Sequence, residues 1–348
     1  MEARRQAVKS IRVLLPSIGH PTRPSLVEAV RGDGERTVEI IGADMDANGI
    51  GPFVADRFVA VPPRTDPGYI DRVLEICRAE RIDVYYALGE EEAIGASERL
   101  VEFEAIGVGV ITPGSADMLR IATNKARYHE FFQARGIPHA RFAAIRSFDE
   151  IEPALRRMGY PEQDVFLKPA VSKGGRGAQL VTARRRETDV PVQSLTSLLE
   201  SMAALRNGKF PELIAMEPLP GTYYSVDVLS KEGKPYYVIP KIRVRGNASN
   251  TTVGEVDLHP GTIALATQAC AAFGFSFLQN YEMRLDRSGE PRIYDINPRG
   301  GTSLILCAAA GANIAYYAVK MALGEEIPRV EVKNKVQMFR YYKEYFRS

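Results

Sequence analysis

The feature that most constrains the fold is an alternation of short apolar runs with helical patterns in the first third of the sequence. These runs and patterns alternate along residues 11–17, 26–30, 38–44, 69–82 and 83–89. Alternation of this kind indicates a parallel sheet with helices on both faces. Such sheets bind ligands at the carboxyl ends of their strands. Gly19 follows the first strand there, but no complete Gly-x-Gly-x-x-Gly motif accompanies it, so this turn is only a weak candidate for nucleotide binding. His20 lies where the crevice of the sheet is expected and is a weak candidate for substrate binding.

The pattern changes near residue 115. A helical segment over residues 116–137 leads, past Pro138, into a smaller unit with strands near Phe142 and Phe166. Beyond it the strands lengthen, and the glycine-containing turns SKEGKP and DRSGEP join alternating runs as two hairpins. We therefore expect an α/β chain in three units. Their predicted ranges are 1–115, 116–213 and 214–348.

Composition narrows the functional classes. With 348 residues, 45% hydrophobic and 25% charged, the chain is expected to be a soluble globular protein with a large core. The net charge of +2 gives no reason to expect nucleic acid or membrane partners. No apolar stretch is long and uncharged enough to span a bilayer. Cys77, Cys270 and Cys307 are widely spaced and fit no disulfide framework or metal pattern, which favours reduced core thiols in a cytoplasmic protein.

A candidate metal site lies late in the chain, in the stretch RIYDINPRGG. Asp295 and Asn297 are two apart on a predicted strand, so they project from one face while Tyr294 and Ile296 face the other way. Pairing across the DRSGEP turn would bring Glu282 to the same place. Oxygen ligands of this kind suit Mg²⁺. The alternative is a polar strand end that simply meets water.

A candidate phosphate site combines a strand and a glycine-rich loop. Lys168 ends an apolar strand, and the following loop can present backbone amides and two positive charges to an anion. The loop consists of Ser172, Lys173, Gly174, Gly175, Arg176 and Gly177. It is not a Walker loop, because no Gly-Lys-Ser/Thr opens a helix after it. A flexible basic hairpin is the competing interpretation.

Two further segments suggest ligand contacts. Met216, Glu217 and Leu219 stand in a Pro- and Gly-containing connector that can hold a flat heterocycle, although a plain interdomain connector fits equally.

Lys241, Arg243 and Arg245 are two apart and are predicted to share one strand face. Cations placed so closely repel each other unless an anion lies among them. A solvated edge strand protected by charge is the alternative.

Together these segments resemble the ATP-grasp superfamily, in the branch similar to carbamoyl-phosphate synthase large-subunit domains and amino-acid ligases. The resemblance covers nearly the whole chain. It implies a parallel-sheet pre-ATP-grasp domain, then a small lobe with a glycine-rich flap, and a large lobe with the magnesium site. The segment ATNKARYHEFFQARGIPHARF resembles the family helix that bears a nucleotide-contacting lysine, here Lys125.

The resemblance also implies roles for individual residues. Lys125 and Lys168 would contact the nucleotide, the latter at its α and β phosphates, and the SKGGRG loop would close over ATP. Glu282, Asp295 and Asn297 would bind Mg²⁺, with Mn²⁺ as an alternative metal. Arg299 would lie near the transferred phosphate, and Arg243 and Arg245 near the reacting carboxylate. The segment containing Met216, Glu217 and Leu219 would contact adenine and ribose.

Two positions depart from the family pattern. Tyr223 stands where a glutamate usually contacts ribose, which puts that contact in doubt. Asp295 replaces the usual, longer glutamate of the metal motif.

The implied activity is that of an ATP-dependent carboxylate–amine ligase. A carboxylate would attack the γ-phosphate, and an amine would then open the acyl phosphate to an amide. The partners would be a small-molecule carboxylate and amine, neither of which the sequence identifies, and a homodimer through the N-terminal unit is implied as well. The alternatives are a bicarbonate-dependent carboxyphosphate-forming enzyme and a nucleotide-binding protein without turnover.

Overall fold

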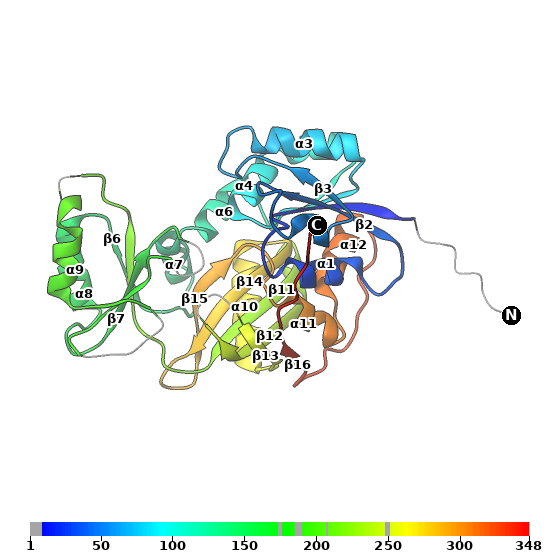
Figure 1. Cartoon of the computed structure of the whole chain (residues 1–348). Coiled ribbons are helices and arrows are strands. Elements are labelled where there is room, and N and C mark those ends of the chain that lie inside the picture. The colour runs from blue at the N-terminus through cyan, green and yellow to red at the C-terminus, as the bar shows by residue number, and fades with distance from the viewer. Residues whose placement is uncertain (1–8, 173–175, 185–189, 207, 248–250, 348) are drawn as a thin grey trace.

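The computed structural model describes residues 9–172, 176–184, 190–206, 208–247 and 251–347, and every structural statement below refers to these residues. Their strands form three sheets (Figure 1). Figure 1 shows the middle sheet standing away from the other two, to which the helices α6 and α7 connect it. The N-terminal and C-terminal sheets lie next to each other.

The N-terminal sheet is entirely parallel, with strand order β3-β2-β1-β4-β5, as the alternating pattern predicts. Its strands are β1 (Ile11–Pro16), β2 (Val38–Asp44), β3 (Arg57–Ala60), β4 (Val84–Tyr86) and β5 (Gly109–Ile111). The accompanying helices are α1 (Arg23–Arg31), α2 (Gly51–Val54), α3 (Tyr69–Glu80), α4 (Glu90–Glu98) and α5 (Leu100–Ala105). The central strands are nearly all buried, because helices cover the sheet and exclude water from apolar side chains.

The segment predicted as one helix over residues 116–137 is in fact two. α6 (Ala116–Ala122) ends before Asn124, and α7 (Lys125–Gln133) begins directly after it. The break has a local cause, since the Asn124 side chain accepts a hydrogen bond from the Arg127 backbone N–H at 3.1 Å and so caps the second helix. Lys125 is therefore the first residue of a helix rather than a mid-helix residue.

The middle sheet has strand order β6-β10-β7-β8-β9. Its strands are β6 (Phe142–Ile145), β7 (Val165–Pro169), β8 (Gln179–Val181), β9 (Val192–Gln193) and β10 (Leu213–Met216). The α-helices α8 (Ile151–Arg157) and α9 (Leu195–Met202) pack on it, with 3₁₀ turns η1 (Phe148–Glu150) and η2 (Ala203–Leu205) beside them. Because β10 lies between β6 and β7, we propose that the two lobes divide after Met216.

The C-terminal sheet has strand order β15-β14-β11-β12-β13-β16 and is antiparallel throughout. Its strands are β11 (Tyr223–Lys231), β12 (Lys234–Gly246), β13 (Thr251–Val256), β14 (Phe277–Leu285), β15 (Pro291–Asn297) and β16 (Gln337–Phe339). The helices in this part of the chain are α10 (Pro260–Phe273), α11 (Leu304–Ala309) and α12 (Ile314–Ala322). Both predicted hairpins, β11–β12 and β14–β15, are present.

The two faces of this sheet differ in character. Tyr224, Val226, Tyr281 and Met283 point to one face and pack in one core cluster with residues of α10. The residues between them, which alternate to the opposite face, include the polar positions discussed below. One set of strands therefore supplies both a hydrophobic core and a polar surface.

Helices from both ends of the chain hold the N-terminal and C-terminal sheets together. α1 packs against α11 and α12, and the Asn313 side chain donates a hydrogen bond to the Ala29 carbonyl at 2.8 Å. The segment after β16 also returns to the N-terminal sheet, where the rings of Tyr345 and Phe53 lie 5.5 Å apart. All three cysteines are buried and free, as predicted. Among the helices of the described residues, none has the length and apolar character to cross a bilayer.

Candidate active site

The predicted metal-binding carboxylates lie opposite each other. Glu282 on β14 pairs with Asp295 on β15, so the two side chains leave the same face of adjacent strands. Burial and the nearby Asp295 raise the pKa of Glu282 above its usual value. Burial also acts to raise the pKa of Asp295, but Lys125 and Lys168 outweigh it and lower that pKa. A further positive charge nearby would therefore stabilise the ionised form of Glu282 more than that of Asp295, which Lys125 and Lys168 already stabilise.

Asn297 extends the pair by one position. It lies opposite Asn280, and its side-chain N–H₂ group donates to the Asn280 side-chain oxygen at 3.4 Å. Arg299 donates to the Asn297 side-chain oxygen at 3.1 Å. The described residues contain no group of three His, Cys, Asp or Glu side chains arranged to hold a metal. A cation bound at Glu282 and Asp295 would therefore need Asn297 or ligand oxygens as well.

Tyr294 corrects the predicted strand pattern. Strand alternation predicts that it faces away from Asp295, as Ile296 does, but its hydroxyl donates to a Glu282 carboxylate oxygen at 2.9 Å. The cause is a shift of the β14–β15 register between Glu282 and Met283, which interrupts the alternation at Tyr294. No turn residue or apolar spacing marks this irregularity in the sequence.

Lys125 and Lys168 converge on Asp295 from different elements. Lys125 Nζ, at the start of α7, lies 3.7 Å from Asp295 Oδ1, and Lys168 Nζ, on β7, lies 4.0 Å from Asp295 Oδ2. Lys125 also donates to the Ser172 carbonyl at 3.0 Å, and Lys168 to the Tyr294 carbonyl at 3.4 Å. Burial and Lys125 lower the pKa of Lys168, while Asp295 partly opposes them. Two buried ammonium groups thus share one carboxylate, which leaves positive charge available for an anion.

The glycine-rich loop is described only in part. Ser172 donates from its hydroxyl to the Pro169 carbonyl at 3.3 Å, and Arg176 is exposed. Gly177 has φ +74°, and a Cβ there would come within 3.0 Å of Pro169, so this position requires glycine. The predicted contacts of Lys173, Gly174 and Gly175 lie outside the described residues.

The predicted adenine-contacting segment borders an apolar wall. Met216 and Leu219 pack in a small cluster, which also contains Ala140, Phe142, Phe166, Ile214 and Tyr294. The Glu217 carboxylate accepts hydrogen bonds from the backbone and side-chain nitrogens of Arg141, each at 2.8 Å. Tyr223 is buried, which raises the pKa of its hydroxyl, and its ring lies 6.5 Å from the Tyr294 ring. Its side chain therefore borders the site.

Their spacing predicts that the three cations of β12 share one face of the strand, but they lie in three different environments. Arg243 lies over the Tyr223 ring at 4.0 Å and faces the site. Arg245 is exposed, because register shifts on both sides of it interrupt the alternation of β12. Lys241 is buried in an ion pair with Asp227, so it is a core residue rather than part of an anion site. The prediction that all three share one anion-binding face is therefore wrong.

A buried polar network supports the site, and no pattern in the sequence indicates it. Asp227 accepts hydrogen bonds from the Gly301 backbone N–H at 2.7 Å and from the Asn280 side chain at 2.9 Å, besides its pair with Lys241. Lys241 also donates to the Ser303 hydroxyl at 3.0 Å. Burial acts to lower the pKa of Lys241, but Asp227 raises it overall. The network fixes the loop that carries Arg299.

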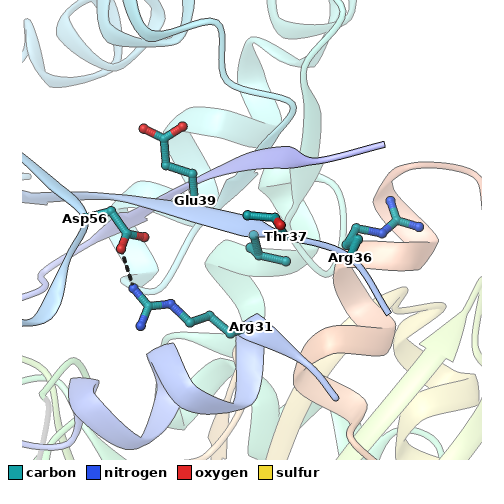
Figure 2. A pocket seen from close by; sticks show the side chains of 6 residues that line it. Arg31, Arg36, Thr37, Glu39 and Asp56 are labelled. Carbon is teal, nitrogen blue, oxygen red and sulfur yellow. Dashed lines mark hydrogen bonds and ion pairs between the residues drawn. The ribbon is translucent and has the colours of Figure 1, made fainter. Parts of the chain in front are cut away.

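A separate hollow of about 570 Å³ lies on the N-terminal sheet (Figure 2). It is lined by Arg31, Arg36, Thr37, Val38, Glu39 and Asp56. Figure 2 shows Arg31 turned toward Asp56, with which it forms an ion pair of 2.7 Å. Val38 begins β2, so the hollow lies at the amino end of that strand, whereas parallel sheets bind ligands at the carboxyl ends. We assign no ligand to it.

Comparison with protein families gives two matches. Residues 209–344 match the family described as ATP-grasp in the biosynthetic pathway with Ter operon. Residues 13–111 match the PylC-like N-terminal domain. These ranges include the C-terminal sheet and nearly all of the N-terminal sheet.

Curated relatives match parts of longer proteins. A formate-dependent phosphoribosylglycinamide formyltransferase from Burkholderia pseudomallei is 32% identical over 154 residues, which are 44% of this chain and 35% of the relative. A carbamoyl phosphate synthase large chain from Rubrobacter xylanophilus is 24% identical over 275 residues, 75% of this chain and 24% of the relative. The chain thus spans about a third or less of these relatives.

Solved structures share the fold along nearly the whole chain. The ADP complex of an N5-carboxyaminoimidazole ribonucleotide synthetase has a TM-score of 0.68 at 17% identity, covering 94% of this chain and 80% of that one. An L-amino acid ligase from Bacillus licheniformis has a TM-score of 0.64 at 17% identity, covering 92% and 76%.

Proposed function

The chain belongs to the ATP-grasp superfamily, and from this premise we propose that it is an ATP-dependent, ADP-forming ligase that joins a small-molecule carboxylate to an amine. The observation that carries the proposal is the convergence of Lys125 and Lys168 on Asp295, directly beside Glu282. Two lysines and two carboxylates come together here from four separate elements, which is more charge than a structural ion pair requires. The arrangement suits a triphosphate with its metal.

The donor set fits Mg²⁺. Glu282 and Asp295 supply carboxylate oxygens from adjacent strands, and Asn297 supplies an amide oxygen on the same face. The raised pKa of Glu282 supports this assignment, because a divalent cation would stabilise the ionised form that burial disfavours. When bound, Mg²⁺ would neutralise phosphate charge.

The remaining residues suit phosphoryl transfer, which depends on positioning and charge neutralisation more than on covalent chemistry by the protein. We assign Lys125 and Lys168 to the phosphates, and the apolar wall at Met216 and Leu219 to the adenine ring. The γ-phosphate would pass to the carboxylate substrate, with ADP leaving. Attack by the amine on the acyl phosphate would then form the amide and release inorganic phosphate.

The test measures ADP release with purified protein over pairs of amino acids, followed by the mass of the product. Lys168→Ala and Asp295→Ala should abolish substrate-dependent ADP release while leaving the far-ultraviolet circular dichroism spectrum unchanged. Lys234→Ala, which removes an exposed lysine at the far end of β12, is the matched control. Full activity in either site variant would refute the assignment.

Bicarbonate-dependent carboxyphosphate formation is the second candidate, because the carbamoyl phosphate synthase match spans three quarters of this chain. That enzyme type would show ADP release stimulated by bicarbonate without any amino acid. ADP release that requires an amino acid would exclude it.

We propose a cytoplasmic location, supported by the three buried, free thiols. A homodimer through the N-terminal unit stays a prediction, which sedimentation equilibrium can test.

A further inference from the structure

Three arginines from distant parts of the chain meet near the amino ends of two packed helices. Asn313, just beyond the end of α11, bonds to Ala29 near the end of α1, so the two helices have their carboxyl ends together. Since α1 and α11 also pack against each other, their amino ends lie together as well. Arg23 is the first residue of α1, and Arg299 lies in the loop that leads into α11.

Arg340 reaches the same place from the segment after β16. Its guanidinium donates to the Thr302 carbonyl at 2.9 Å, directly before α11, and to the Thr251 carbonyl at 3.3 Å. Arg23 donates to the Ser17 carbonyl at 3.1 Å, in the turn after β1. Arg299 donates to the Gly300 carbonyl at 3.1 Å. Each guanidinium is thus oriented by a backbone carbonyl.

These three half-buried guanidinium groups form no ion pair with any carboxylate of the described residues. Four arginines in and beside the N-terminal sheet do form such pairs: Arg12, Arg31, Arg36 and Arg57. Burial and the neighbouring Arg299 lower the pKa of Arg23 to about 10. Glu92 is the nearby acid, but its carboxylate already accepts hydrogen bonds from the backbone N–H groups of Leu88 and Gly89 and from Tyr69.

His20 stands at the edge of this group. It is exposed, and its Nδ1 lies 2.9 Å from the Thr22 hydroxyl. Its pKa is lowered by partial burial and by the charges of Arg23, Arg299 and Arg340, which act on it together. The turn after β1 is the carboxyl end of a parallel strand, where such sheets bind ligands.

From this juxtaposition we propose that Arg23 and Arg340, with His20, form a second anion-binding subsite. The carboxylate substrate would then carry another anionic group besides its reacting carboxylate. The proposal rests on the proposed ligase function and specifies its substrate class: a small molecule with a carboxylate and a second carboxylate or a phosphate. Arg299 links the subsite to the metal site through Asn297. A guanidinium fork pairs well with either kind of anion.

The test titrates inorganic phosphate and succinate into the full chain by calorimetry, with ADP and Mg²⁺ at saturation so that the nucleotide site is filled. Arg23→Gln and Arg340→Gln should each weaken binding of the preferred probe by at least about tenfold. Arg31→Gln, at the other end of α1 and paired with Asp56, should bind as the wild type does. Arg340→Lys should bind with intermediate affinity, because it keeps the charge but loses the fork.

Tighter binding of phosphate than of succinate would assign a phosphate group to the substrate, and the reverse order a second carboxylate. The subsite is refuted if the wild type binds neither probe, or if Arg23→Gln and Arg340→Gln bind as Arg31→Gln does. Melting curves show whether a variant is folded. Titrating ADP with Mg²⁺ alone, and repeating the anion titration without nucleotide, separates the two proposals. Failure of ADP to bind would contradict the ligase function, whereas the anion titration without nucleotide would still test the subsite.

Discussion

Replacing Lys241 by methionine should destabilise the protein strongly, although Lys241 lies outside the predicted contacts with ATP. Lys241 is 2% exposed and Asp227 is fully buried, so the variant would leave the Asp227 carboxylate buried without its counter-charge. Breaking a buried pair by removing one partner costs about 3–5 kcal/mol. Asp227 also holds the Gly301 backbone and Asn280, so we expect ADP release to fall as well.

The assay is urea denaturation followed by circular dichroism. With an m-value of about 3 kcal/mol/M, the top of the range for small proteins, the expected loss lowers the midpoint by roughly 1 M. Adding Asp227→Asn to Lys241→Met should restore part of the loss, because no unpaired charge is then buried and the Asn oxygen can still accept from Gly301. Lys234→Met is the control from the exposed end of β12. An unchanged midpoint for Lys241→Met, or no recovery in the double variant, would refute the reasoning.

Three further predictions concern the site directly. Mg²⁺ affinity, measured by calorimetry, should fall as pH drops through the raised pKa of Glu282, because protonation removes a metal ligand. The fall should occur at a higher pH than the ordinary glutamate pKa of 4.5, and Glu282→Gln should abolish this pH dependence. Tyr294→Phe should move the loss of Mg²⁺ affinity to still higher pH, because the Tyr294 hydrogen bond stabilises the ionised Glu282 carboxylate in the wild type. An unchanged pH profile would contradict this prediction, and Tyr236→Phe is the control. Gly177→Ala, strained by about 1–2 kcal/mol, should raise the KM for ATP in steady-state assays, whereas Gly208→Ala should not.

Much of the fold follows from local patterns in the sequence. The parallel N-terminal sheet could be predicted because each strand and helix shows its own periodicity. That Glu282 lies near Asp295 could be predicted because a short turn joins their two strands, but the direct pairing of the two residues depends on the register shift between Glu282 and Met283. Asn124 has the residue type of a helix cap, but the apolar pattern continues past it and suggested one helix.

The irregular parts could not be predicted in this way. Tyr294 turns toward Glu282 because of a register shift, and Arg245 leaves the site because of two others, none of which has a local signature. The Asp227–Lys241 pair joins adjacent strands, but alternation alone does not distinguish a buried cation from one that faces a ligand. Arg23 and Arg340 are over 300 positions apart in the sequence, so only the packing of helices reveals their proximity.

The shared use of β14 and β15 by core and site limits where the chain can change length. An inserted or deleted residue within either strand would exchange the two faces beyond that point, so that Tyr281 or Met283 would meet water while Glu282 entered the apolar layer beneath α10. Stability and chemistry would be lost in one event. The turn at residues 286–290 belongs to neither the core nor the site, so we expect homologues to differ in length there.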